Sequence, residues 1–239
     1  VELKGATFSA DVAVSHTQVQ SRNVIGKITG SKRPDETVAY AAHWDAYGLA
    51  DKPDAGGKRV RPGALDDAIG IAGLFEIARN LKAGPAPERT VLFAAWTGEE
   101  RGLLGSEYFA QHPTVPLEKM AGAYTLDVLQ PVGPAKDVVL VGAGQNDLED
   151  GLAVAARAQG RVITPDARPE RGLFYRADHF SLAKRGVPVI LLMALGGGAD
   201  LVEGGRAAGD KWVSAYTATA YHQTGDAWSA DWDLRGAAM

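Results

Sequence analysis

Apolar positions along the chain follow two alternating periods, and this alternation predicts an α/β fold. Strand-like apolar runs occur at 37–45, 89–98, 122–129, 137–144 and 187–195. Segments with helical spacing or composition lie between them, at 68–81, 103–112, 147–160 and 179–186. Because strands and helices alternate, we predict a mostly parallel, mixed central sheet with helices on both faces.

The first thirty residues show a different pattern. Segments 7–15 and 23–30 alternate apolar and polar residues with a period of two, which is typical of half-exposed strands. We therefore expect two strands before the main alternation begins. At 239 residues and 46% hydrophobic composition, the chain is long enough for one well-buried domain, which we expect to span residues 1–239.

Composition excludes several function classes. A net charge of -4 with scattered Lys and Arg residues gives no basic surface, so nucleic acid is not an expected partner. The longest apolar run, 187–195, is about half of the roughly 20 residues that a membrane-spanning helix needs, so no membrane partner is expected either. With no cysteine, the chain has no disulfides and no thiolate metal sites, and any metal must be held by His and carboxylates.

The chain begins at Val1 with no starter methionine and no signal sequence. This favours a processed or excised piece whose targeting segment is absent. We expect an extracytoplasmic location, periplasmic or secreted, and the sequence leaves the oligomeric state open.

Acidic and histidine side chains gather where the predicted strands end, at His43, Asp45, Glu99, Glu100 and Asp127. The carboxyl ends of parallel strands meet at one edge of a sheet, where active sites of such folds usually lie. Asp66 precedes the first strong helix and His222 lies in a late loop. Taken singly, a helix-capping Asp, a solvated carboxylate and a structural His are the simpler interpretations. Together, these nitrogen and oxygen donors suit zinc or a similar divalent ion.

Six segments, in order, resemble the di-zinc aminopeptidase family of metallopeptidases: "AHWDAYG", "GALDDAIGIAGLFEIAR", "TGEERGLLGS", "YTLDVL", "RADHFSLAKRGVPVI" and "YHQTGD". Relatives of this family include glutamate carboxypeptidases, glutaminyl cyclases and the non-catalytic transferrin receptors. The resemblance spans most of the chain and implies the zinc exopeptidase fold.

The resemblance also implies a ligand set for two zinc ions or similar divalent ions. His43 and Asp127 match the ligands of one ion, Glu100 and His222 match those of the other, and Asp66 matches the carboxylate that bridges both. Asp45 matches an acid that orients the imidazole of His43. The family pattern further implies a cis peptide bond between Asp66 and Asp67.

Glu99 matches the family's general base. Adjacent residues of an extended segment point in different directions, so Glu100 can bind metal while Glu99 faces the substrate. The base would take a proton from a metal-activated water and deliver it to the leaving amine. Tyr221 matches a position whose hydroxyl contacts the reacting carbonyl in some relatives, and Arg176 matches one that contacts a carboxylate end of substrate or product.

The function that we expect is therefore a zinc-dependent exopeptidase acting on peptides. An aminopeptidase that removes N-terminal residues is the leading interpretation. A carboxypeptidase or a glutaminyl cyclase on the same fold remains open, as does a binding module without catalysis. The complete ligand set for two metal ions favours hydrolysis over glutaminyl cyclase chemistry. Together with the retained Glu99, it also counts against a binding module without catalysis.

Overall fold

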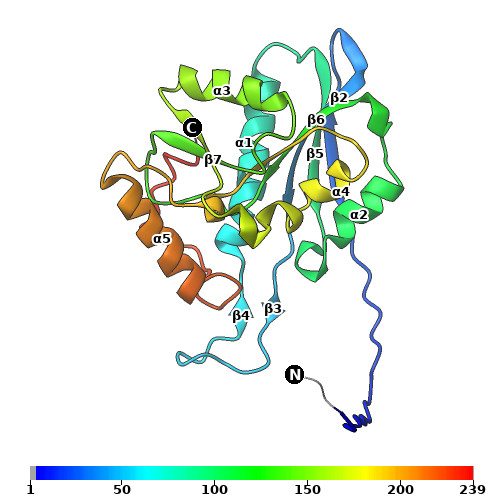
Figure 1. Cartoon of the computed structure of the whole chain (residues 1–239). Helices are drawn as coiled ribbons and strands as arrows, with labels where there is room; N and C mark the ends of the chain where they lie inside the picture. Colours follow the sequence, from blue (N-terminus) through cyan, green and yellow to red (C-terminus); the bar gives the residue numbers. More distant parts are fainter. Residues whose placement is uncertain (1–3, 239) are drawn as a thin grey trace.

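A seven-stranded mixed sheet forms the centre of the computed structural model, which describes residues 4–238 (Figure 1). Along the sheet, the strand order is β1-β5-β2-β6-β9-β7-β8. The four middle strands run parallel, whereas β1 pairs antiparallel with β5 and β7 pairs antiparallel with β9. The strands are β1 (Val24–Ile28), β2 (Arg33–His43), β5 (Arg89–Trp96), β6 (Met120–Leu126), β7 (Asp137–Val141), β8 (Val162–Pro165) and β9 (Val189–Leu192).

Helices cover both faces of the sheet. One face packs on α1 (Ile69–Ala83) and α3 (Leu148–Ala158). The other packs on α2 (Leu104–Gln111), α4 (His179–Ala183) and α5 (Gly205–Thr219). Successive residues of β2 point to opposite faces of the sheet. Ala41 belongs to the cluster with Phe109 and Leu182, whereas Ala42 packs with Leu74 of α1.

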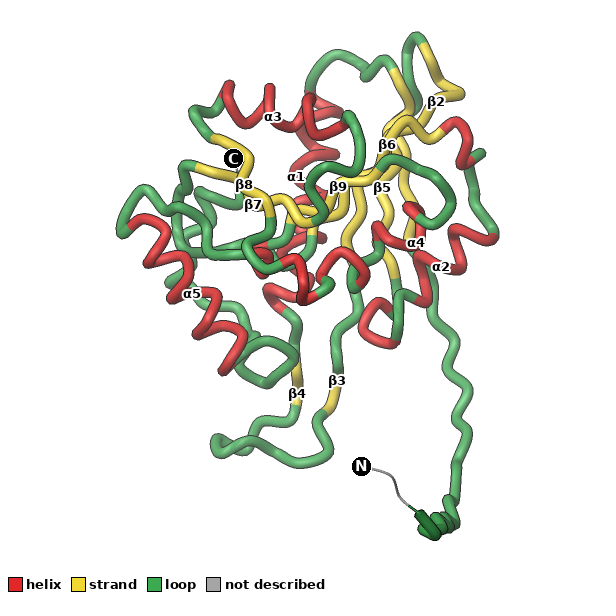
Figure 2. The backbone as a smooth tube through the Cα atoms, viewed as in Figure 1, coloured by secondary structure: helices red, strands yellow, loops and turns green. Residues whose placement is uncertain are grey.

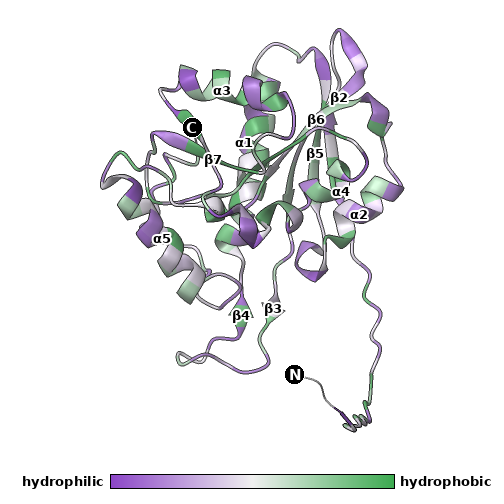
Figure 3. Ribbon diagram, viewed as in Figure 1, coloured by the Kyte–Doolittle hydropathy of each residue, from purple (hydrophilic) through white to green (hydrophobic). Residues whose placement is uncertain are grey.

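Small and apolar residues explain why the helices pack closely against the central strands. Ala41, Ala42 and Ala94 are completely buried, and they let helices approach both sides of the sheet. Figure 3 shows hydrophobic residues along the central strands and hydrophilic residues on parts of α3 and α5. The buried rings of Trp96 and Phe109, 5.0 Å apart between centroids, join the end of β5 to α2.

The strand register places the predicted site residues at one edge. His43, the last residue of β2, is paired with Trp96, the last residue of β5. Ala41 is paired with Thr125 of β6, so Asp127 lies level with His43. The turn that follows Trp96 carries Glu99, so three strands deliver acids and a histidine to the same edge.

A two-stranded hairpin, β3 (Gly48–Leu49) and β4 (Val60–Arg61), lies between β2 and α1 in the chain. It projects away from the main sheet, as Figure 2 shows. A groove of about 550 Å³ lies between α1 and α3; Ile77, Leu126 and Leu152 are among its lining residues, which include none of the convergent acids.

The observed fold confirms the α/β prediction, but one predicted strand is absent and several observed elements were not predicted. Segment 7–15 forms no strand but is extended and exposed, with Phe8 92% accessible, because its alternating residues meet no sheet edge with which to pair. The helix α5, the strand β8 and the β3–β4 hairpin were not predicted. No helix within residues 4–238 is long and apolar enough to cross a membrane.

Candidate metal centre

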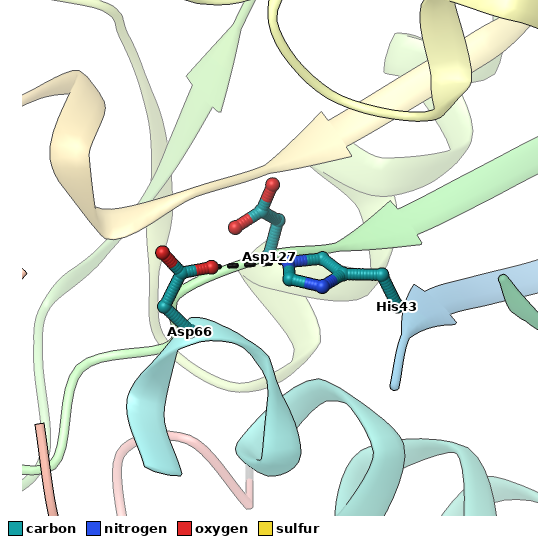
Figure 4. A group of neighbouring side chains, drawn as sticks. All are labelled: His43, Asp66 and Asp127. Atoms are coloured by element: carbon teal, nitrogen blue, oxygen red, sulfur yellow. Dashed lines mark hydrogen bonds and ion pairs between the residues drawn. The ribbon is translucent and has the colours of Figure 1, made fainter. Parts of the chain in front are cut away.

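Two groups of three potential metal ligands share one carboxylate. His43, Asp66 and Asp127 form the first group, drawn in Figure 4, and Asp66, Glu100 and His222 form the second. Within each group, one donor atom from every residue lies within 4.8 Å of the others. The structure thus brings together the five residues that the sequence predicted as ligands, with Asp66 in the shared position.

The contacts of His43 test whether a cation fits the first group. Its Nδ1 lies 3.0 Å from the backbone carbonyl oxygen of Asp45, which can only accept, so Nδ1 carries the proton. In the neutral ring, Nε2 then directs a lone pair at Asp66 Oδ1, 3.0 Å away. Two acceptors facing each other inside the protein require a proton or a metal ion between them, and His and carboxylate donors are those that zinc accepts.

The second group shows the same arrangement. His222 Nε2 lies 3.1 Å from Asp66 Oδ2 and 3.2 Å from Glu100 Oε2. Asp66 is 4% exposed, and its Oδ2 has no hydrogen-bond partner among the described residues. A buried carboxylate oxygen without a donor, aimed at an imidazole nitrogen, fits a bound cation.

Carboxylate crowding gives an independent reason for a positive charge at this place. Burial, together with Asp127, raises the pKa of Glu99 to about 10, and burial with Asp66 raises those of Glu100 and Asp127 to about 8 and about 7. Burial alone would lower the pKa of His43, but the adjoining carboxylate of Asp66 raises it well above its ordinary value. A bound divalent ion lowers the pKa of each nearby carboxyl group, because it favours the charged form.

Glu99 belongs to neither ligand group. It is 8% exposed, and its Oε2 lies 3.9 Å from His43 Nε2. Glu99 and Glu100 begin a short 3-10 turn, Glu99–Arg101, after β5. Within this turn the adjacent glutamates diverge, so Glu100 meets His222 while Glu99 faces the side of His43.

The carboxylate of Asp45 occupies a different place from the one that the family resemblance implied. Its Oδ1 is 3.8 Å from His43 Nδ1, too far for a hydrogen bond, and it is the backbone oxygen of Asp45 that meets the imidazole. The carboxylate accepts the backbone N–H groups of Glu99, at 3.1 Å, and Glu100, at 3.3 Å. Asp45 therefore fixes both the imidazole and the glutamate turn.

Two buried aspartates that the sequence reasoning did not assign hold the backbone under the site. Asp226 accepts hydrogen bonds from the backbone N–H groups of Leu65, at 2.9 Å, and Asp66, at 3.1 Å, and from Tyr216 Oη. Asp67 accepts from the backbone N–H of His43 at 3.1 Å. The Asp66–Asp67 peptide bond is cis, as the resemblance implied. Asp226 ends the segment "YHQTGD", four residues after His222, and this position was the sequence signal for its role.

Tyr221 and Arg176 lie together beside the second group. The Tyr221 ring stacks on His222 with centroids 3.7 Å apart, and Arg176 Nη2 donates to the Tyr221 hydroxyl at 3.5 Å. Burial, followed by Asp66, raises the pKa of Tyr221, so its hydroxyl keeps its proton at neutral pH. Both residues adjoin the ligands where a substrate could reach them.

Residues 23–238 match peptidase family M28. The chain belongs to this family. Among curated relatives, a probable zinc metalloprotease from Pyrenophora tritici-repentis is 34% identical over 141 residues, which is 58% of this chain and 26% of that protein. A glutamate carboxypeptidase 2 homolog from Caenorhabditis elegans is 32% identical over 134 residues, 54% of this chain and 16% of that protein.

Solved structures agree on the fold. A leucine aminopeptidase precursor from Bacteroides thetaiotaomicron superposes with a TM-score of 0.56 at 22% identity, covering 74% of this chain and 65% of that one. A zinc aminopeptidase from Bacillus subtilis gives a TM-score of 0.54 at 23% identity, covering 72% and 39% of the two chains. The M28 chain described here spans about a quarter or less of the length of the curated relatives named above.

Proposed function

We propose that this chain forms the catalytic site of a zinc-dependent exopeptidase that removes N-terminal residues from peptides. The observation that carries the proposal is the pair of ligand groups joined by Asp66, with Glu99 beside them and in neither. Membership of peptidase family M28 and the fold shared with zinc aminopeptidases support it.

Different residues of the chain would bind the metal ions and transfer the proton during peptide hydrolysis. His43, Asp66 and Asp127 would hold one zinc ion, and Asp66, Glu100 and His222 the other. Bound zinc supplies Lewis acidity, which polarises a carbonyl oxygen and makes water a better nucleophile at neutral pH. Glu99 takes a proton from the attacking water and returns it to the leaving amine.

Neighbouring groups position Glu99 and the substrate. The Asp45 carboxylate holds the backbone of the Glu99–Glu100 turn, which fixes where the base can reach. The protonated Tyr221 hydroxyl can donate a hydrogen bond to the oxygen of the reacting carbonyl, where negative charge develops. Arg176, which contacts that hydroxyl, can hold it in place or bind a carboxylate of the substrate.

A carboxypeptidase is the second candidate, because one relative is named as a glutamate carboxypeptidase 2 homolog. Peptides with one blocked end separate the two functions. The aminopeptidase proposal expects cleavage of peptides with a free amine and an amidated C-terminus, loss of that cleavage after chelation, and its recovery with zinc. Cleavage restricted to N-acetylated peptides with a free C-terminus would instead establish the carboxypeptidase, and no cleavage of either set by zinc-loaded protein would refute hydrolysis.

A further inference from the structure

A tyrosine flanked by two arginines lies at the border of the second ligand group. Tyr47 follows β2, and its ring centroid is 4.3 Å from that of His222. The guanidinium carbons of Arg61, at the end of β4, and of Arg101, at the end of the glutamate turn, each lie 5.7 Å from the Tyr47 ring. Three segments far apart in the sequence thus place two cations beside the candidate metal centre.

Neither guanidinium has an anionic partner. Arg61 and Arg101 form no ion pair and no side-chain hydrogen bond with any part of the chain between residues 4 and 238, whereas Arg89 and Arg206 are bound by carboxylates. Contact with the Tyr47 ring orients the two planar groups without using their N–H donors. Those donors remain available to a ligand.

The position of Arg61 connects this pair to the reacting region. A small recess is lined by Tyr47 and Arg61 together with Asp66, Glu100 and His222. The acids in that recess are the ones that bound zinc would neutralise. The two guanidinium groups then remain as positive charge beside an incoming peptide.

We propose that Arg61 and Arg101 bind a carboxylate of the peptide substrate, so that the site selects peptides with an acidic group close to the scissile bond. The inference rests on the proposed peptidase function and specifies its substrate class. Arg is suited to this role because its planar fork of donors matches a carboxylate. That carboxylate could belong to an acidic side chain or to the free C-terminus of a short peptide.

Four dipeptides separate these two sources of the carboxylate. Leu-Gln-amide has neither acidic group, Leu-Glu-amide has only the side chain, Leu-Gln has only the C-terminus, and Leu-Glu has both. We expect zinc-loaded protein to show a kcat/KM for at least one carboxylate-bearing dipeptide that is about 10-fold above that for Leu-Gln-amide, equivalent to about 1.4 kcal/mol. The difference should lie mainly in KM and shrink at high salt.

Charge-removing variants assign this preference to the two arginines. The double variant Arg61→Gln/Arg101→Gln should bring the ratio between charged and uncharged dipeptides to within about 2-fold, and Arg61→Lys/Arg101→Lys should restore part of it. Lys58→Gln is the matched control, because it removes one positive charge from the tip region of the same hairpin, and the ratio should not change.

A binding measurement keeps the inference separate from the activity. In the zinc-loaded Glu99→Gln variant, calorimetry should show tighter binding of the preferred charged dipeptide than of Leu-Gln-amide, and the arginine substitutions should remove the difference. Equal kcat/KM and equal binding for all four dipeptides would overturn the carboxylate site and leave the peptidase proposal intact. A preference that survives both double variants would likewise overturn it, whereas binding selectivity without any turnover would count against the peptidase proposal alone.

Discussion

Replacing each of the adjacent glutamates by glutamine should separate a base from a ligand. Glu99 lies outside both ligand groups, with its nearest histidine contact at 3.9 Å, whereas Glu100 lies 3.2 Å from His222 Nε2 inside the second group. Glutamine keeps nearly the same volume in each case, so packing is preserved. Any difference between the two variants therefore reports the chemistry of the lost charge.

For Glu99→Gln, we expect turnover to fall roughly 100-fold or more, the scale of general acid-base catalysis, which corresponds to about 2.7 kcal/mol or more of barrier. Zinc content should stay at the wild-type value. The metal-free variant should also be more stable than metal-free wild type at pH 7, because burial and Asp127 raise the pKa of Glu99 to about 10 and make its charge unfavourable there.

For Glu100→Gln, we expect weaker zinc binding first and loss of activity as its consequence, with partial recovery in excess zinc. The assay measures zinc content and peptidase rate for both variants over one zinc titration. If Glu99→Gln loses zinc while Glu100→Gln keeps it, the two roles are reversed. Full activity in both variants would refute the proposed mechanism.

Two further predictions concern the support of the site and its metal. Asp226→Asn should raise the zinc concentration needed for activity, because a charged acceptor for the Leu65 and Asp66 N–H groups is lost, at a cost of about 1.5–3 kcal/mol. Tyr216→Phe removes only a donor to Asp226, so it should act more weakly in the same titration. Equal effects of the two variants would contradict the role of Asp226 in holding the backbone. Chelation should lower Tm by roughly 5–10 °C for each zinc site at which free zinc exceeds Kd about 100-fold. The folded-state pKa values of Glu99 and Asp127 are raised to about 10 and about 7, so their stabilising contribution in metal-free protein is present at low pH and lost as pH rises through those values. The Tm difference between zinc-loaded and chelated protein should therefore widen from pH 5 to pH 8, and a constant difference would argue against carboxylate crowding.

The periodicity of apolar residues predicted the elements whose own sequence defines a buried face. The runs at 37–45 and 89–98 became β2 and β5, and 68–81 became α1, because each carries enough apolar residues to define a buried face. Segment 7–15 has the alternation of a strand but no partner, and pairing depends on tertiary structure that a local pattern does not contain. The helix α5 was missed because its Gly, Ser and Thr residues weaken the helical signal.

The sequence likewise predicted some of the site residues and not others. The candidate ligands could be predicted because they occur in a recognisable order of motifs, and the register of β2, β5 and β6 explains why they meet. Asp226 and Tyr47 could not be assigned, because their roles arise from contacts with a backbone loop and with His222 that only the folded chain brings together. The place of the Asp45 carboxylate, on the turn and not on the imidazole, likewise required the structure.

The zinc content of the purified, zinc-loaded chain tests the shared-ligand centre most directly. The two groups joined by Asp66 predict close to two zinc ions per chain, measured by atomic emission after removal of free metal. His222→Ala, which removes a ligand from one group only, should lower this value toward one, and Asp66→Ala, which removes the shared ligand, should lower it further. A wild-type content of zero after zinc loading, or a content that Asp66→Ala leaves unchanged, would contradict the assignment.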